Sequence, residues 1–125
     1  MSAYLIIALG SAIGGALRHA VNLGIARLLG TAWPSGTFTV NIVGSLAMGL
    51  IAGYFALKGH ASHPWVLFLT TGILGGFTTF SAFSLDVALL YDRGRLDLAA
   101  GYLAASVALS VGALFLGLAI VRRFG

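Results

Sequence analysis

The chain has 125 residues, of which 59% are hydrophobic and only 8% are charged, whereas soluble domains carry about 25% charged residues. Its seven cations are scattered rather than clustered, which argues against a nucleic-acid-binding protein. The absence of cysteine excludes disulfides and thiolate metal sites. We therefore expect a single all-α integral membrane domain over residues 1–125, embedded in a lipid bilayer.

Four apolar segments are long enough to cross a bilayer as helices, which takes about 20 residues each. We predict transmembrane helices at about residues 3–29, 36–57, 65–91 and 96–121. Trp33 and Trp65 fall near predicted ends, where aromatic residues often mark the membrane interface. Four crossings place both termini on the same side of the membrane.

The cations divide evenly between the two sides of the predicted bundle. Lys58, Arg122 and Arg123 fall on the side of the termini, and Arg27, Arg93 and Arg95 fall on the other. The positive-inside rule then gives no preference, so we expect insertion in both orientations, which makes an antiparallel, dual-topology homodimer available. The alternative is that Arg18, the histidines or the lipid select one orientation.

Arg18 is the unusual residue of the first segment. Glycines at Gly10 and Gly14 have the spacing that lets membrane helices approach closely, which is common and unspecific. A guanidinium inside a span is costly, so Arg18 either extends to the interface or faces a wet vestibule, where it would attract anions.

Asn41 is the polar residue that most constrains the second segment. Thr37, Asn41 and Ser45 recur every four residues and share one helix face. An amide cannot stay unpaired in hydrocarbon, so Asn41 either bridges to another helix or offers its donors to a passing ion.

The third segment contains the stretch GILGGFTTFSAFS, from Gly72 to Ser84. Its three glycines each disfavour helix by about 1 kcal/mol relative to alanine, and two β-branched threonines follow. We therefore expect the third helix to be broken in the middle of the membrane. Backbone groups freed there must be buried in protein, line a wet cavity or bind an ion, and we interpret the break as an ion site.

Phe80 and Phe83 follow the expected break with a spacing that places them on one side of a helix. Such a pair usually packs in a core. Beside an anion path, the positive edges of the two rings could replace part of the hydration of the anion without a fixed cation.

Three hydroxyls lie four residues apart in the fourth segment, at Tyr102, Ser106 and Ser110. Hydroxyls in membrane helices often bond the backbone carbonyl four residues back, and that alternative stays open here. Together with the polar face of the second segment, the hydroxyls favour a water or ion track.

The positions of the ionisable residues argue against other classes. A small multidrug-type transporter would need a carboxylate deep in its first helix to exchange protons for cationic drugs, and the first segment has none. His60 and His63 lie in a loop without a thiol or carboxylate beside them, which disfavours an enzyme or metal centre. A nonconducting membrane scaffold packed through its glycine faces remains as the second alternative.

These residues resemble the small fluoride channels called Fluc or CrcB, and the resemblance spans nearly the whole chain. It is carried by Gly14, Gly15 and Arg18 in the first segment, by Pro34, Gly36, Thr37, Asn41 and Gly44 in the second, by GGFTTFSAF from Gly75 to Phe83 in the third, and by Tyr102 and Ser106 in the fourth. The chain departs from the pattern at Leu114, where many relatives have threonine, and at Asp86, where some have glutamate.

The resemblance implies a passive, fluoride-selective channel in the bacterial inner membrane that expels fluoride through the two antiparallel pores of a dimer, without enzymatic activity. It also implies the following residue roles: carbonyls of Gly75 and Thr78 on one structural sodium ion, an aromatic box of Phe80 and Phe83, a pore amide at Asn41, a polar track of Tyr102, Ser106 and Ser110, and a vestibule cation at Arg18.

Overall fold

The computed structural model describes residues 2–59 and 63–124, and within these ranges the secondary structure is entirely helical. Four helical segments are long and apolar enough to cross a membrane, which confirms the number of spans predicted from hydropathy. They cover Ala3–Leu29, Ser35–Leu57, Pro64–Asp92 and Leu96–Phe124. His60 lies outside the described residues.

The first, second and fourth spans are the single helices α1 (Ala3–Leu29), α2 (Ser35–Leu57) and α6 (Leu96–Phe124). None contains an internal proline, so the backbone ladder runs through each of them. The Ser2 hydroxyl accepts the Leu5 amide at 3.2 Å and caps the start of α1. At its other end α1 stops at Gly30, whose φ of 78° favours glycine.

The third span is divided into four pieces: α3 (Pro64–Leu67), the π-helix η1 (Phe68–Leu74), α4 (Gly75–Phe77) and α5 (Ser81–Asp92). Residues 78–80 between α4 and α5 are not helical, and Thr78 has extended backbone angles of −84° and 160°. The glycines at positions 72, 75 and 76 are themselves helical, contrary to the expectation that they disrupt the helix. The chain leaves the helix after them, at the threonines.

These glycines instead allow close helix packing. A Cβ added at Gly14 would overlap the backbone of Ile73, and one added at Gly76 would overlap the backbone of Ser11. The backbones of α1 and the third span are therefore in direct contact. A Cβ at Gly49 of α2 would overlap the Leu114 carbonyl of α6 in the same way. Close approach of this kind is how membrane helices associate without a hydrophobic driving force.

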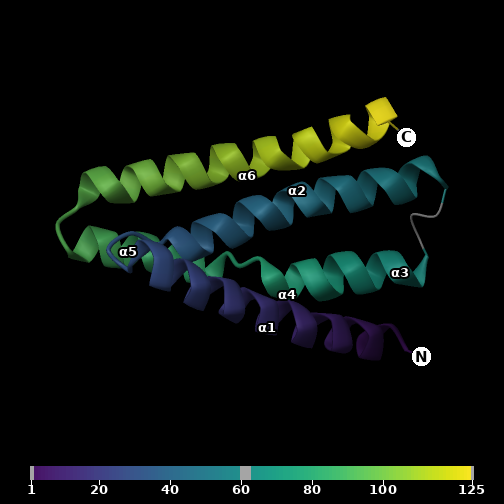
Figure 1. Ribbon diagram of the computed structural model, residues 1–125, viewed down its shortest axis with the longest axis horizontal. Coiled ribbons are helices and arrows are strands. Elements are labelled where there is room, and N and C mark those ends of the chain that lie inside the picture. The colour runs from purple at the N-terminus through teal and green to yellow at the C-terminus, as the bar shows by residue number, and fades with distance from the viewer. Residues whose placement is uncertain (1, 60–62, 125) are drawn as a thin grey trace.

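The four spans run lengthwise through the molecule, with both chain ends at the same end of the bundle (Figure 1). Helix α2 packs most extensively against α6, and α1 packs against η1 and α4. The connections from α1 to α2 and from α5 to α6 lie at the end opposite the termini (Figure 1), which we call the loop end.

A compact apolar cluster lies towards the loop end, where α5 meets α6. Its buried members are Phe83, Leu90, Ala99 and Tyr102, and Trp33 and Phe38 pack against it. Elsewhere many large apolar side chains face outward, such as Leu5, Leu17 and Leu116. Water would not tolerate so much exposed apolar surface, whereas lipid tails cover it at no cost.

Candidate functional site

A groove of about 390 Å³ lies between α2, α6 and the segment that joins α4 to α5. Five of the six predicted pore residues line this groove: Asn41, Phe80, Phe83, Ser106 and Ser110. The sixth, Tyr102, lies directly behind Phe83, with the two ring centroids 5.2 Å apart. Residues from three spans that are far apart in the sequence therefore converge on one groove.

Asn41 joins α2 to the non-helical segment through both ends of its amide. Its Nδ2 donates to the Thr79 carbonyl at 3.0 Å, and its Oδ1 accepts the Thr79 amide at 2.9 Å. A backbone N–H can only donate, so the second bond determines which amide atom is the oxygen. The bridging alternative for Asn41 is the one that the structure adopts. Nδ2 has a second N–H besides the one that donates to the Thr79 carbonyl.

Two backbone amides near the break donate to side chains in place of the helical ladder. In a continuous α-helix the Thr79 amide would bond the Gly75 carbonyl, and the Ala82 amide would bond the Thr78 carbonyl. Instead the Thr79 amide donates to Asn41, and the Ala82 amide donates to the Thr79 hydroxyl at 3.1 Å. The carbonyls of Gly75 and Thr78 are thereby released from the helical ladder. Carbonyl oxygens without a helical donor are suitable ligands for a cation. The resemblance assigns these same two carbonyls to sodium.

The hydroxyls of Ser106 and Ser110 are buried in the groove wall. Neither Oγ has a hydrogen-bond partner within the part of the chain that the structure describes. Other hydroxyls do bond the carbonyl four residues back, namely those of Thr39, Thr70, Thr78 and Ser84. Ser106 and Ser110 thus do not adopt the backbone-bonded alternative. An unsatisfied buried polar group costs about 1–3 kcal/mol, which an occupant that accepts hydrogen bonds would recover.

Phe80 and Phe83 form the aromatic side of the groove. Their ring centroids are 5.6 Å apart with planes inclined at 51°. Phe83 is buried at 5% exposure, whereas Phe80 is 77% exposed in the single chain. The two rings are therefore neighbours, with Phe80 at the open edge of the groove.

Tyr102 is separated from the two serines by the direction of its hydroxyl. Its ring is 1% exposed and packs edge-on against Trp33 at 5.3 Å. Its hydroxyl donates to Asp86 Oδ2 at 3.1 Å. Of the three predicted track hydroxyls, two therefore serve the groove and the third bonds a carboxylate nearer the loop end.

Arg18 lies apart from the groove. It is half-buried and lines a different pocket of about 500 Å³, together with His19, Asn22 and Ser81. Ser81 is the first residue of α5, so this pocket adjoins the far side of the non-helical segment.

Comparison with known proteins identifies the family. Residues 5–118 match the family described as CrcB-like protein, Camphor Resistance (CrcB). The chain belongs to the CrcB family. As a member with four apolar spans, it is a multi-pass membrane protein.

Several curated relatives of this CrcB-family chain are similar over nearly their whole length. The fluoride-specific ion channel FluC 2 of Nitrobacter hamburgensis is 58% identical over 96% of this chain and 97% of its own. The fluoride-specific ion channel FluC of Rhodopseudomonas palustris strain BisB5 is 59% identical over 95% and 96%. That of Granulibacter bethesdensis is 56% identical over 98% and 96%.

Sequence reasoning missed the partners of two site residues in this CrcB-family chain. Asn41 bonds the backbone of Thr79, 38 residues along the chain. The pattern of side chains in the sequence does not indicate such a backbone contact. Asp86 accepts a hydrogen bond from the Tyr102 hydroxyl, 16 residues away. The spacing of the hydroxyls had predicted that Tyr102 shares a helix face with the two serines.

Proposed function

We propose that this chain is a passive, fluoride-selective channel, and not an enzyme, which lets fluoride leave the cytoplasm down its electrochemical gradient. Three of the relatives, each more than half identical, are named fluoride-specific ion channels. The observation that carries the proposal is the pair of buried hydroxyls of Ser106 and Ser110, which have no hydrogen-bond partner among the described residues and lie in a groove with two phenyl rings.

The chemistry of the groove suits a small anion that accepts hydrogen bonds. The two hydroxyls and the second Nδ2 proton of Asn41 are donors, and phenyl edges carry partial positive charge. The residues that line the groove carry no formal charge. Neutral donors replace the hydration of an anion without the deep trap that a lysine or arginine would create, which suits conduction.

We further propose that two chains associate antiparallel. The even distribution of cations supports insertion in both orientations. Phe80 is 77% exposed and Gly75 is also exposed in the single chain. A second chain over this surface would cover Phe80 and close the open edge of the groove, completing an aromatic box from both chains.

The same arrangement would provide a site for one structural sodium ion. Gly75 and Thr78 carbonyls, whose helical donors bond elsewhere, would come from both chains to give four oxygen ligands. Hard monovalent cations take such oxygens, and binding would satisfy acceptors that lipid cannot. Sodium would hold the dimer together and takes no part in moving fluoride.

Fluoride efflux from reconstituted liposomes tests the function. Vesicles loaded with potassium fluoride are given valinomycin to carry the counter-charge, and released fluoride is read with an electrode. We expect rapid release from vesicles that contain the protein and almost none from empty ones. A nonconducting scaffold would release nothing, and a drug transporter would release nothing without its drug or proton gradient.

The position of a carboxy-terminal tag tests the antiparallel arrangement separately. In sealed membrane vesicles, insertion in both orientations protects about half of the tags from an added protease, as the positive-inside rule predicts for balanced charge. Complete protection or complete cleavage would reject dual insertion while leaving the fluoride assay unaffected.

A further inference from the structure

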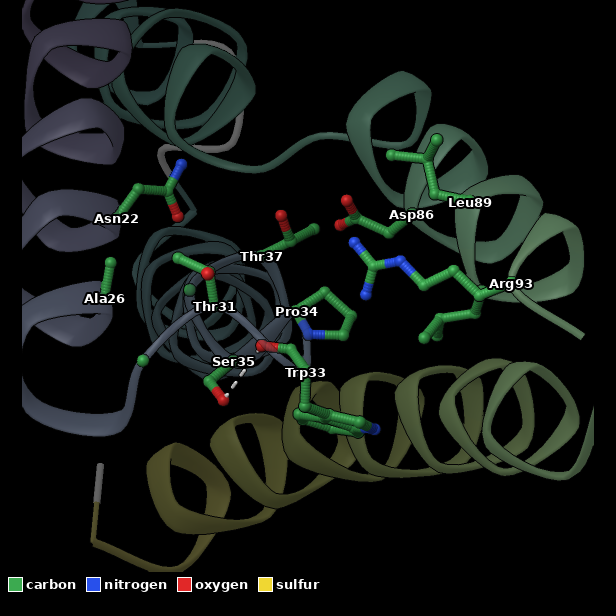
Figure 2. Close-up of a pocket in the computed structure, with 13 residues that line it drawn as sticks. Asn22, Ala26, Thr31, Trp33, Pro34, Ser35, Thr37, Asp86, Leu89 and Arg93 are labelled. Atoms are coloured by element: carbon green, nitrogen blue, oxygen red, sulfur yellow. Dashed lines mark hydrogen bonds between the residues drawn. The ribbon is translucent and has the colours of Figure 1, made fainter. Parts of the chain in front are cut away.

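A second cavity lies at the loop end of the bundle, separate from the groove. It has a volume of about 270 Å³ and is enclosed by α1, the start of α2, and α5 with the turn that follows it. Its lining includes one acidic and one basic side chain, Asp86 and Arg93. We call it the mouth pocket. Figure 2 shows the side chains of Asp86 and Arg93 both extending into it from α5 and the turn that follows.

Tyr102 lies between a residue that lines the mouth pocket and a residue that lines the groove. On one side its ring packs against Phe83, which lines the groove. On the other side its hydroxyl donates to Asp86, which lines the mouth pocket. Ser106, one helical turn along α6, lines the groove next to Phe83. An ion that moves along the serines towards the loop end therefore meets Tyr102 and, beyond it, the mouth pocket.

Asp86 makes this route unfavourable for an anion when considered alone. Its carboxylate is half-buried, and unscreened like charges within a few ångströms repel strongly in such an environment. The Tyr102 hydroxyl, one of the donors that an anion would need, is directed at Asp86 Oδ2 at 3.1 Å.

Arg93 is placed to offset this charge. Its Nη1 donates to the carbonyl of Ala32, in the connection between α1 and α2, at 3.5 Å. This bond holds the guanidinium beside the mouth pocket. In Figure 2 one terminal nitrogen of Arg93 lies on the side of the Asp86 carboxylate. A guanidinium has five N–H donors, so anchoring one of them leaves others for the carboxylate or for an anion between them.

We propose that Arg93 is a positioning and charge-compensating residue of the conduction path, which neutralises Asp86 and makes the mouth pocket passable to fluoride. The proposal rests on the proposed fluoride conduction and adds a second ion station at the loop end. There, fluoride enters or leaves the groove past Tyr102 in a pocket whose acidic and basic groups balance.

The test compares charge-removing substitutions in reconstituted liposomes, with fluoride release read by an electrode. Focusing of charge in clefts changes ion entry rates by about tenfold or more, so we expect Arg93→Gln to slow fluoride release by about that factor. Arg93→Lys keeps the charge and should retain at least about half of the rate.

Arg95→Gln is the matched control, because it removes the same charge two residues away. Arg95 pairs with Asp97 at 3.2 Å on the exposed surface, outside the mouth pocket. We expect it to release fluoride at the wild-type rate. Equal slowing in Arg93→Gln and Arg95→Gln, or no slowing in either, would overturn the assignment of Arg93.

The double substitution Asp86→Asn with Arg93→Gln separates compensation from damage to the fold. If Arg93 acts by neutralising Asp86, removing both charges should restore fluoride release to within about twofold of wild type, because the two sites are coupled. A double variant as slow as Arg93→Gln alone would overturn the proposal. Absence of release from wild-type vesicles would overturn the proposed function itself, so the two failures are distinguishable.

Discussion

Replacement of Asn41 by leucine tests the feature on which the groove depends. Leucine has nearly the same size but can neither donate to the Thr79 carbonyl nor accept the Thr79 amide, bonds of 3.0 and 2.9 Å in the structure. Each buried backbone group left without a partner costs about 1–3 kcal/mol, so the loss should lower the free energy of unfolding by about 2–6 kcal/mol.

The chain has one route to reduce this cost, and that route would also abolish conduction. The Thr79 amide could return to the Gly75 carbonyl and continue α4, which would rotate Phe80 away from its present position. We therefore expect Asn41→Leu to lose fluoride release whether or not the helix rewinds.

Unfolding of the purified protein in mixed micelles, titrated with a denaturing detergent, measures the change in stability. Val43→Leu is the control, since Val43 lies two residues along α2 and faces outward. It should unfold at the wild-type midpoint. An Asn41→Leu variant with the same midpoint as Val43→Leu would refute the view that the amide clamp maintains the non-helical segment.

Three further predictions concern the rings, the helix packing and the cation. Phe80→Ile should abolish fluoride release, because an aliphatic side chain has no positively polarised ring edge to offer an anion; unchanged release would remove the ring from the pore. Gly49→Ala should lower the free energy of unfolding by about 1–3 kcal/mol through overpacking against the Leu114 carbonyl. In the control Gly112→Ala, the added Cβ meets no described atom within 4 Å, so the free energy of unfolding should stay the same or rise slightly. Equal effects of the two substitutions would contradict the packing. Replacing sodium by N-methylglucamine should lower the thermal midpoint of the detergent-solubilised protein; a midpoint independent of sodium would reject the cation site.

The helices of this chain could be predicted because membrane helices depend mainly on local composition. Apolar runs without internal proline predict membrane spans, with Gly30 and Gly94 at two of the boundaries. The described residues form four such spans, of which three are single helices. The π-helix at Phe68–Leu74 had no such signal. It depends on how η1 packs against the glycines of α1, which is a property of two segments together.

The non-helical residues 78–80 of the third span come after the glycines at which the break was expected. Low helix propensity drew attention to the glycines, yet Gly75 and Gly76 are helical. The chain leaves the helix where competing partners exist, since Asn41 and the Thr79 hydroxyl accept amides that would otherwise continue the ladder. Propensity is a weak guide wherever tertiary hydrogen bonds compete with the backbone.

The candidate site was predictable as a set of residue types but not as a set of contacts. Helical spacing placed Ser106 and Ser110 on one face, and both line the groove. The same spacing did not reveal that the longer side chain of Tyr102 reaches Asp86. Arg93 looked like an ordinary loop cation, because only the folded chain brings the turn after α5 over the start of α2.

The most direct measurement of the central claim is anion selectivity in one set of vesicles. Liposomes that contain the purified protein and equal concentrations of fluoride and chloride are opened to efflux with valinomycin, and both ions are followed by electrodes at the same time. The account predicts that fluoride leaves rapidly while chloride stays inside until detergent is added. Release of chloride at the rate of fluoride, or retention of both ions, would contradict it.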